Sequence, residues 1–326
     1  MKTKNVFCFA LHSVFITFAM KIEKLHKKSE DVKNFGYHLL AILTIAIWGV
    51  TFVNTKVLLQ HGLQPMEIFL LRFIMAYLCI WTISPKKIKS QSWKDERLFL
   101  VLGLMGGTVY FAAENTAIGL TYVNNVSFII CTAPLITMLL AILFVKSVKA
   151  TAPLILGSVI ALMGVGMVIY NGTFVVKLNP LGDMLTLGAA LSWGIYSLVI
   201  RKLSYRYEAS FITRKVFFYG ILTVLPLFLL KPWNFPLPQL RQPAVWMNLL
   251  FLSVVASFLC FLWWNVAVKK IGAISTSNYI YLNPITTMIA SAMFLQEPMT
   301  LIAYIGSALI LLGVFVANHK NNSGER

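Results

Sequence analysis

The chain has 326 residues, of which 58% are hydrophobic and only 12% are charged. Soluble domains carry about 25% charged residues, so the composition excludes an ordinary soluble protein and predicts an all-α polytopic membrane protein. The net charge of +17 would suggest a nucleic-acid partner in a soluble protein. Here the basic residues lie mostly between apolar runs, so we expect the lipid bilayer as a partner and no nucleic acid.

The segment before the first long apolar run, residues 1–36, contains a shorter apolar stretch. The sequence NVFCFALHSVFITFAM (Asn5–Met20) is interrupted by His12 and Ser13 and is followed by a basic run. A signal-like segment, a partial span, or an extension upstream of a natural start at Met20 would each give this pattern. No small-residue cleavage site follows, so we favour the extension, in which residues 1–19 are not native.

Ten apolar runs of about the length that crosses a bilayer follow, and each predicts a transmembrane helix. They cover residues 37–58, 66–83, 98–120, 124–144, 152–170, 183–201, 209–230, 246–268, 273–295 and 301–317. Most of the basic residues lie in every second connection between the runs and in the tail at 318–326. By the positive-inside rule both termini are cytoplasmic, in a plasma (inner) membrane.

Two distant parts of the chain repeat each other at an offset of 150 residues. Pro134 matches Pro284 within similar apolar runs, and Asn115 matches Asn265. Nearer the start of each copy, the Trp-Gly pair at residues 48–49 matches the pair at 193–194. The chain therefore divides into two five-helix halves, 37–170 and 183–317. Because five is odd, the second half enters the membrane from the opposite face, an inverted repeat typical of alternating-access transporters.

With these motifs the chain resembles the EamA-type transporters of the drug/metabolite transporter superfamily. The Trp-Gly pairs and mid-helix prolines fit the family pattern, as do Leu71-Arg72-Phe73 with Ala76 and the stretch FLQEPMTLIAYIGSALILLGV (Phe294–Val314). The resemblance implies a secondary transporter that exports a small organic metabolite, such as an amino acid or related amine. The first half departs from the pattern, because Lys146-Ser147 stand where Gln296-Glu297 stand later. Glu297 suits the start of the tenth helix, where an anion is favourable.

Glu114 is the one acidic residue predicted to lie well inside a span, where an ionisable side chain is costly and needs a reason. At helical spacing it shares a face with Gly107 and Tyr110, and Asn115 is adjacent. Two roles fit: a counter-charge for an amine-bearing substrate, or a carrier of the coupling proton. Alternatively, Glu114 lies at a hydrated helix end and has no role in transport.

Further candidates for a substrate cavity are aromatic and amide side chains on other predicted helices. Aromatic rings with a few amides suit a small organic molecule, although rings near span ends also form interfacial belts. The candidates are Trp48, Trp193, Tyr196, Trp264, Asn265, Asn278, Tyr281 and Asn283, beside Tyr110, Glu114 and Asn115. Pro134 and Pro284 each free a carbonyl one turn earlier, and we expect them to act in gating.

An intramembrane enzyme and an ion channel are the competing functions. The five histidines (His12, His26, His38, His61 and His319) lie outside the predicted interior, and no zinc-protease, serine-hydrolase or P-loop motif occurs. The four cysteines form no metal-ligand spacing. A channel would need a filter-like loop or a charged ring. We therefore expect no enzymatic activity, no metal and no cofactor; the sequence gives no indication of oligomeric state.

Overall fold

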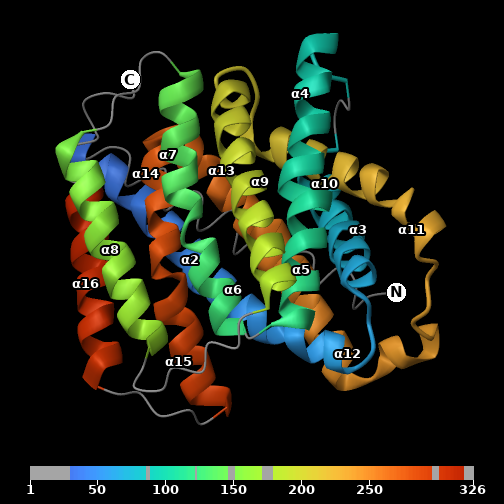
Figure 1. Ribbon diagram of the computed structural model, residues 1–326. Helices are drawn as coiled ribbons and strands as arrows, with labels where there is room; N and C mark the ends of the chain where they lie inside the picture. Colours follow the sequence, from blue (N-terminus) through green and yellow to red (C-terminus); the bar gives the residue numbers. More distant parts are fainter. Residues whose placement is uncertain are drawn as a thin grey trace.

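The computed structural model describes residues 30–85, 89–121, 123–145, 151–170, 179–295 and 301–318. All regular secondary structure within these ranges is helical (Figure 1). The elements are α2 (Glu30–Gln60), α3 (Pro65–Ile83), α4 (Trp93–Gly103), η1 (Leu104–Val109), α5 (Tyr110–Leu120), α6 (Val123–Ile130), α7 (Ala133–Phe144), α8 (Ala152–Tyr170), α9 (Pro180–Ser204), α10 (Ala209–Val224), α11 (Leu227–Leu230), η2 (Leu237–Arg241), α12 (Pro243–Leu250), η3 (Phe251–Leu259), α13 (Cys260–Ile271), α14 (Ala273–Ser277), η4 (Asn278–Leu282), α15 (Asn283–Leu295) and α16 (Leu301–Asn318).

Seven helices in the described ranges are long and apolar enough to cross a membrane, and two shorter apolar helices lie in α8 and α16. The seven are Phe35–Gln60, Pro65–Ile83, Trp93–Leu120, Val126–Phe144, Pro180–Ser204, Ala209–Leu230 and Pro243–Ile271. The protein is therefore a multi-pass, all-helical membrane protein, which confirms the predicted class.

Capping side chains start two helices several residues before the apolar runs that predicted them. The helix predicted at 98–120 begins at Trp93, since the Ser92 hydroxyl accepts a hydrogen bond from the Asp95 amide at 3.1 Å. The helix predicted at 183–201 begins at Pro180, since Asn179 accepts from the Gly182 amide at 3.0 Å. Both caps stabilise a turn outside the apolar stretch.

Two of the predicted spans are interrupted just before a proline. The chain turns at Cys131 and Thr132 between α6 and α7, and Pro134 follows in the first turn of α7. The short 3₁₀ helix η4 ends at Leu282, and Pro284 follows in α15. Proline has no N–H, so each leaves the carbonyl four residues earlier without its helical donor.

Two further irregularities occur at repeat-equivalent places. The π-helical segments η1 and η3 end at Val109 and Leu259, which are 150 residues apart. A π-helical turn inserts an extra residue into a helix and commonly accompanies functional sites. Directly after them come α5 and α13, which carry Tyr110, Glu114 and Trp264.

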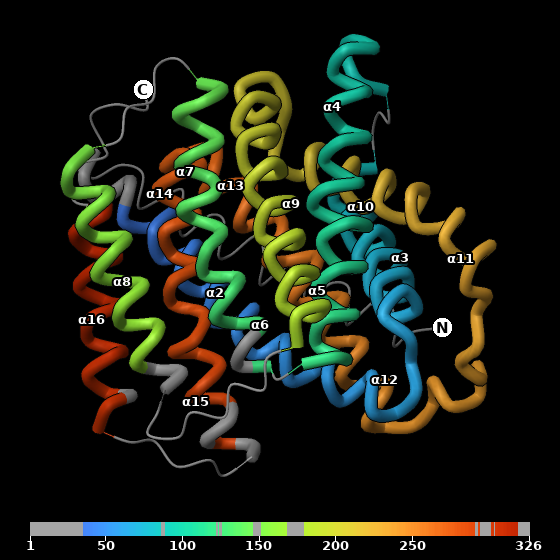
Figure 2. Tube along the Cα trace, in the orientation of Figure 1, coloured from blue at the N-terminus to red at the C-terminus, as the bar shows by residue number. Residues whose placement is uncertain are grey.

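Helices α8 and α16 lie side by side at one edge of the molecule (Figures 1 and 2). A Cβ on Gly157 would lie 2.4 Å from the Ala317 nitrogen and 2.6 Å from the Gly313 oxygen, and one on Gly164 would lie 2.6 Å from the Gly306 oxygen. Residue numbers rise along α8 as they fall along α16, so the two helices are antiparallel. Small residues permit this close backbone approach.

Gly157→Ala is expected to lower the free energy of unfolding by about 1–3 kcal/mol, because the added methyl group meets backbone atoms that cannot rotate away. Gly166→Ala is the matched control on the same helix, since a Cβ there meets nothing within 4 Å. Thermal unfolding of both variants in detergent measures the difference. Equal midpoints would contradict this account of α8 and α16.

Carboxylates at the start of α4 bind the connection between α9 and α10. Asp95 accepts hydrogen bonds from Arg206 Nη1 at 2.9 Å and from the Tyr207 hydroxyl at 2.9 Å. Burial raises the pKa of Tyr207 above its ordinary value, so its hydroxyl stays protonated and donates. These bonds join a helix of the first half to the second half.

The neighbouring carboxylate, Glu96, reaches α10 itself. It accepts hydrogen bonds from Lys215 and from the Tyr219 hydroxyl. Lys215 is 3% exposed, and its ammonium lies 5.4–5.8 Å from the ring centroids of Phe99, Phe211 and Tyr219. A buried lysine inside an aromatic cage depends on its carboxylate partner.

Candidate functional site

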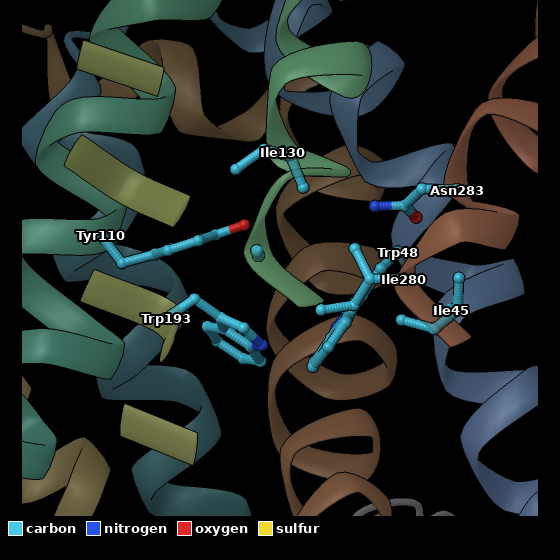
Figure 3. Close-up of a pocket in the computed structure, with 8 residues that line it drawn as sticks. Ile45, Trp48, Tyr110, Ile130, Trp193, Ile280 and Asn283 are labelled. Atoms are coloured by element: carbon cyan, nitrogen blue, oxygen red, sulfur yellow. The ribbon is translucent and has the colours of Figure 1, made fainter. Parts of the chain in front are cut away.

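A small pocket of about 20 Å³ lies between helices of the two halves (Figure 3). Its lining comes from seven helical segments separated widely in sequence, from α2 to α15. The lining residues are Ile45, Trp48, Tyr110, Ile130, Ala133, Trp193, Ile280 and Asn283. Four of them (Trp48, Tyr110, Trp193 and Asn283) are residues that the sequence predicted for the site.

The cavity is lined by repeat-equivalent residues in pairs. Ile130 and Ile280 both line it, and so do Ala133 and Asn283, each pair separated by 150 residues. The two isoleucines stand four residues before Pro134 and Pro284, which cannot donate to their carbonyls. The Ile280 carbonyl accepts instead from the Asn283 N–H and from the Cys131 thiol at 3.6 Å. The cavity thus lies where the two interrupted helices meet.

Trp48 and Trp193, the tryptophans of the two Trp-Gly pairs, form one wall. Their ring centroids are 5.1 Å apart with an interplanar angle of 88°, an edge-to-face contact. Trp264 lies behind them, 5.1 Å from Trp48 and 5.6 Å from Trp193. Tyr110 packs against Trp193 at 5.1 Å.

Tyr110 connects the cavity to the buried carboxylate. Its hydroxyl donates to Glu114 Oε1 at 2.6 Å, and Glu114 is 7% exposed. Arg72 lies close enough for its charge to act on Glu114. Arg72 donates from Nε to the Ser257 hydroxyl at 2.9 Å and stacks 4.3 Å from the Phe111 ring centroid. A buried carboxylate therefore lies beside the pocket, and the Tyr110 phenol connects the two.

The other predicted site residues lie outside the lining. Tyr196 packs on Trp193 at 4.8 Å, but its hydroxyl donates to Asn265 at 3.2 Å. Tyr281 is fully buried near Ser158 of α8. Asn278 donates to Asn318 at 3.0 Å, at the far end of α16. These contacts join helices to one another.

Asn115 and Asn265 serve equivalent structural purposes in the two halves. Asn115 Nδ2 donates to the Pro65 carbonyl at 3.1 Å, which ties α5 to the first residue of α3. Asn265 Nδ2 donates to the Thr213 hydroxyl at 2.8 Å, which ties α13 to the first turns of α10. The repeat thus conserves a brace between the second and third helices of each half.

Sequence reasoning missed Ile45, Ile130, Ala133 and Ile280, since apolar residues in an apolar span give no signal of their own. The 150-residue offset was the available signal for three of them, since Ile130, Ala133 and Ile280 lie within four residues of a repeated proline. Lys146, Glu297 and the segment 1–19 lie outside the described residues. Within the described residues, no group of three or more His, Cys, Asp or Glu side chains could hold a metal ion.

A family comparison decides what kind of protein this is. The model of the EamA-like transporter family matches residues 36–170 and again residues 180–319. The chain belongs to the EamA-like transporter family. The two matched segments follow the two sequence repeats.

Relatives of this EamA-family protein are named as transporters and exporters. An uncharacterized transporter of Archaeoglobus fulgidus is 26% identical over 87% of this chain and 98% of its own length. A "probable terminal-alkyne amino-acid exporter" of Streptantibioticus cattleyicolor is 23% identical over 87% of this chain and 94% of its own. A "probable amino-acid metabolite efflux pump" of Escherichia coli is 22% identical over 85% and 93%.

A solved crystal structure has the same fold. It superposes with a TM-score of 0.68 over 89% of this chain and 98% of its own, at 16% sequence identity. The overall helical fold is therefore shared with that protein.

Proposed function

We propose that this EamA-family protein is a secondary transporter that exports a small organic metabolite, such as an amino acid or related amine, by alternating access. The observation that carries the proposal is the central cavity lined by repeat-equivalent pairs. A site at the interface of two repeats can face either side of the membrane when one repeat rocks against the other. The names of the exporters from Streptantibioticus cattleyicolor and Escherichia coli support the substrate class.

The proposed alternating access uses two inverted five-helix repeats, and the packing of α8 and α16 supports them. These are the last helices of the two halves and carry the matched glycines, Gly157 with Gly306 and Gly164 with Gly313. Equivalent helices of inverted repeats run antiparallel, as α8 and α16 do. Ten spans in this arrangement place both termini on the cytoplasmic side of the plasma membrane.

In this proposal the substrate binds among Trp48, Tyr110, Trp193 and Asn283, with Glu114 supplying negative charge behind Tyr110. Trp264 and Tyr196 pack against the tryptophans of the site. The remaining predicted residues, Asn115, Asn265, Asn278 and Tyr281, support the helices around it. Pro134 and Pro284 give α7 and α15 the interrupted backbone that a gate needs to bend. The coupling ion is the proton if Glu114 exchanges one.

Cysteine labelling tests the topology on which the proposal depends. With the four native cysteines replaced by serine, single cysteines are placed at Ser90, Pro236 and Asn321. An impermeant thiol reagent added outside intact cells is expected to label only the cysteine at 236, because the other two positions face the cytoplasm. Labelling of all three from outside would contradict the inverted repeats.

Transport itself is tested in vesicles that contain the purified protein. Counterflow is measured with a panel of amino acids, amines and sugars. We expect movement of at least one amino acid or amine and none of the sugars. Movement of ions down their gradient without a solute requirement would favour a channel, and chemical conversion of a panel member would favour an enzyme.

A further inference from the structure

The first two helices of the first half are bonded to the second half. Helix α2 lies along α13 and α15, and its Trp48 Nε1 donates to the Ala256 carbonyl of η3 at 2.9 Å. Helix α3 lies along η3, where Arg72 Nε donates to the Ser257 hydroxyl at 2.9 Å. Helices α2 and α3 therefore form one unit with α12, η3, α13, η4 and α15.

The first two helices of the second half are bonded to the first half in the same way. Helix α9 lies along α5 and α7, and its Ser192 hydroxyl donates to the Met105 carbonyl of η1 at 2.5 Å. Helix α10 lies along α4 and η1, and its Gly220 carbonyl accepts from the Thr108 hydroxyl at 3.1 Å. Helices α9 and α10 therefore form a second unit with α4, η1, α5, α6 and α7. The two units also meet along α3 and α10.

The cavity lies between these two units. The first unit supplies Ile45, Trp48, Ile280 and Asn283, and the second supplies Tyr110, Ile130, Ala133 and Trp193. Figure 3 shows Ile45 and Asn283 across the cavity from Tyr110 and Trp193. A volume of about 20 Å³ holds about one water molecule, so the units are closed around the cavity. A metabolite enters only when the units separate at one end.

Two hydrogen bonds join the units at the outer end of the cavity, where α2 ends and α3 begins. Asn115 of α5 is fully buried and donates from Nδ2 to the Pro65 carbonyl of α3 at 3.1 Å. Lys56 of α2 donates from Nζ to the Ile118 carbonyl at 2.7 Å. Ile118 lies in the last turn of α5, where carbonyls lack a helical donor and a cation is favourable. Separation of the units at this end breaks both contacts.

Corresponding hydrogen bonds join the units at the cytoplasmic end. Asn265 of α13 is fully buried and donates from Nδ2 to the Thr213 hydroxyl of α10 at 2.8 Å. Its amide oxygen accepts from the Tyr196 hydroxyl of α9 at 3.2 Å. Arg214 of α10 donates from Nη1 to the Ser84 carbonyl at the end of α3, at 2.6 Å. Separation of the units at this end breaks this second set of contacts.

We propose that Asn115 and Asn265 are the gate residues of the transport cycle, one closing the cavity toward the outside and the other toward the cytoplasm. The inference rests on the proposed function and deepens it by assigning the contacts that alternate. The two asparagines stand 150 residues apart, at equivalent places of the repeat. An inverted repeat turns equivalent residues toward opposite sides of the membrane. The outward-facing state breaks the Asn115 contact and keeps those of Asn265, and the inward-facing state does the reverse.

Directional accessibility of the cavity tests this assignment in the full-length chain. Ala133→Cys is the reporter, in a chain whose four native cysteines are serine. A small impermeant thiol reagent is added to right-side-out and to inside-out vesicles, and the labelling rate is measured in each. The gate variants are Asn115→Ala for the outer end, and Asn265→Ala and Thr213→Val for the cytoplasmic end.

We expect Asn115→Ala to raise the labelling rate from outside about threefold to tenfold and not to raise the rate from the cytoplasmic side. One lost hydrogen bond between the units shifts the equilibrium between closed and open states by this factor. Asn265→Ala and Thr213→Val are expected to raise the rate from the cytoplasmic side alone. Thr213→Val keeps the side-chain volume, so it tests the cytoplasmic gate even if Asn265→Ala lowers the yield of folded protein.

Thr186→Val is the matched control. Thr186 and Thr213 are both fully buried, and each donates at 2.8 Å to the carbonyl four residues earlier in its own helix. Thr213 in addition accepts a hydrogen bond from Asn265 across the units. We expect Thr186→Val to leave both labelling rates unchanged.

Equal changes from both sides in the gate variants, or no change in any of them, would overturn the gate assignment. The transporter proposal survives that result if the reporter without gate variants is labelled from both sides. A reporter that is labelled from one side only, and that no gate variant affects, overturns both.

Discussion

Glu114→Gln is expected to lower amine transport by about tenfold to a hundredfold, while the protein still inserts into the membrane. Glutamine keeps an oxygen that accepts from the Tyr110 hydroxyl, but it removes the negative charge behind Tyr110. A hydrogen bond supported by a charge contributes about 1.5–3 kcal/mol, which sets the size of the effect. Transport is measured in vesicles both with a pH gradient and as substrate exchange without one.

The two assays separate the roles of the carboxylate. If Glu114 favours an amine substrate through Tyr110, both modes fall and the affinity for the amine drops. If it carries the coupling proton, gradient-driven transport falls and exchange survives. Behaviour like that of the unmodified protein in both assays would contradict either role.

A control variant is needed because Arg72 is 2% exposed and its charge acts on Glu114. Glu114→Gln removes the negative charge nearest this buried cation, which leaves its charge less compensated. The double variant Glu114→Gln with Arg72→Gln removes both charges. We expect it to recover thermal stability but not transport, which distinguishes a lost function from a lost fold.

Lys215→Met is expected to lower the free energy of unfolding by about 2–4 kcal/mol, because it leaves Glu96 without its cation where α4 meets α10. Glu96→Gln leaves Lys215 without its carboxylate among the aromatic rings. We expect it to lower the free energy of unfolding by about the same amount. The double variant recovers part of the loss, since no charge is then left unpaired. Thermal and denaturant unfolding in detergent measure all three.

Lys269→Met is the matched control for this pair. Lys269 lies 3.8 Å from Glu208, whose side chain is 84% exposed, so solvent screens the attraction. We expect a change of at most a few tenths of a kcal/mol. Equal losses from Lys215→Met and Lys269→Met would show that the contact between α4 and α10 does not depend on the buried ion pair.

The membrane class and the helical segments could be predicted from the sequence because a bilayer demands long apolar runs. The repeat pointed to Trp48 and Trp193, and the structure brings these two rings together although they lie far apart in the chain. Glu114 stood out because a carboxylate inside a span is rare. Each of these signals is local in the sequence or is a repetition within it.

What the sequence could not supply is which side chains face one another. A transmembrane helix is apolar on nearly every face, so Ile130 and Ile280 look the same as residues that face lipid. Asn115 and Asn265 were expected in the cavity because amides need partners, yet the Pro65 carbonyl and the Thr213 hydroxyl lie within reach. No sequence pattern singles out Lys215, and only its packing distinguishes it from Lys269.

Accessibility of the cavity from both sides tests alternating access most directly. Ala133, which lines the cavity, is replaced by cysteine in a chain whose four native cysteines are serine. A small impermeant thiol reagent is applied to right-side-out and to inside-out vesicles. Alternating access predicts labelling in both orientations and slower labelling when a transported amine is present. Labelling from one side only, unchanged by any substrate, would contradict it.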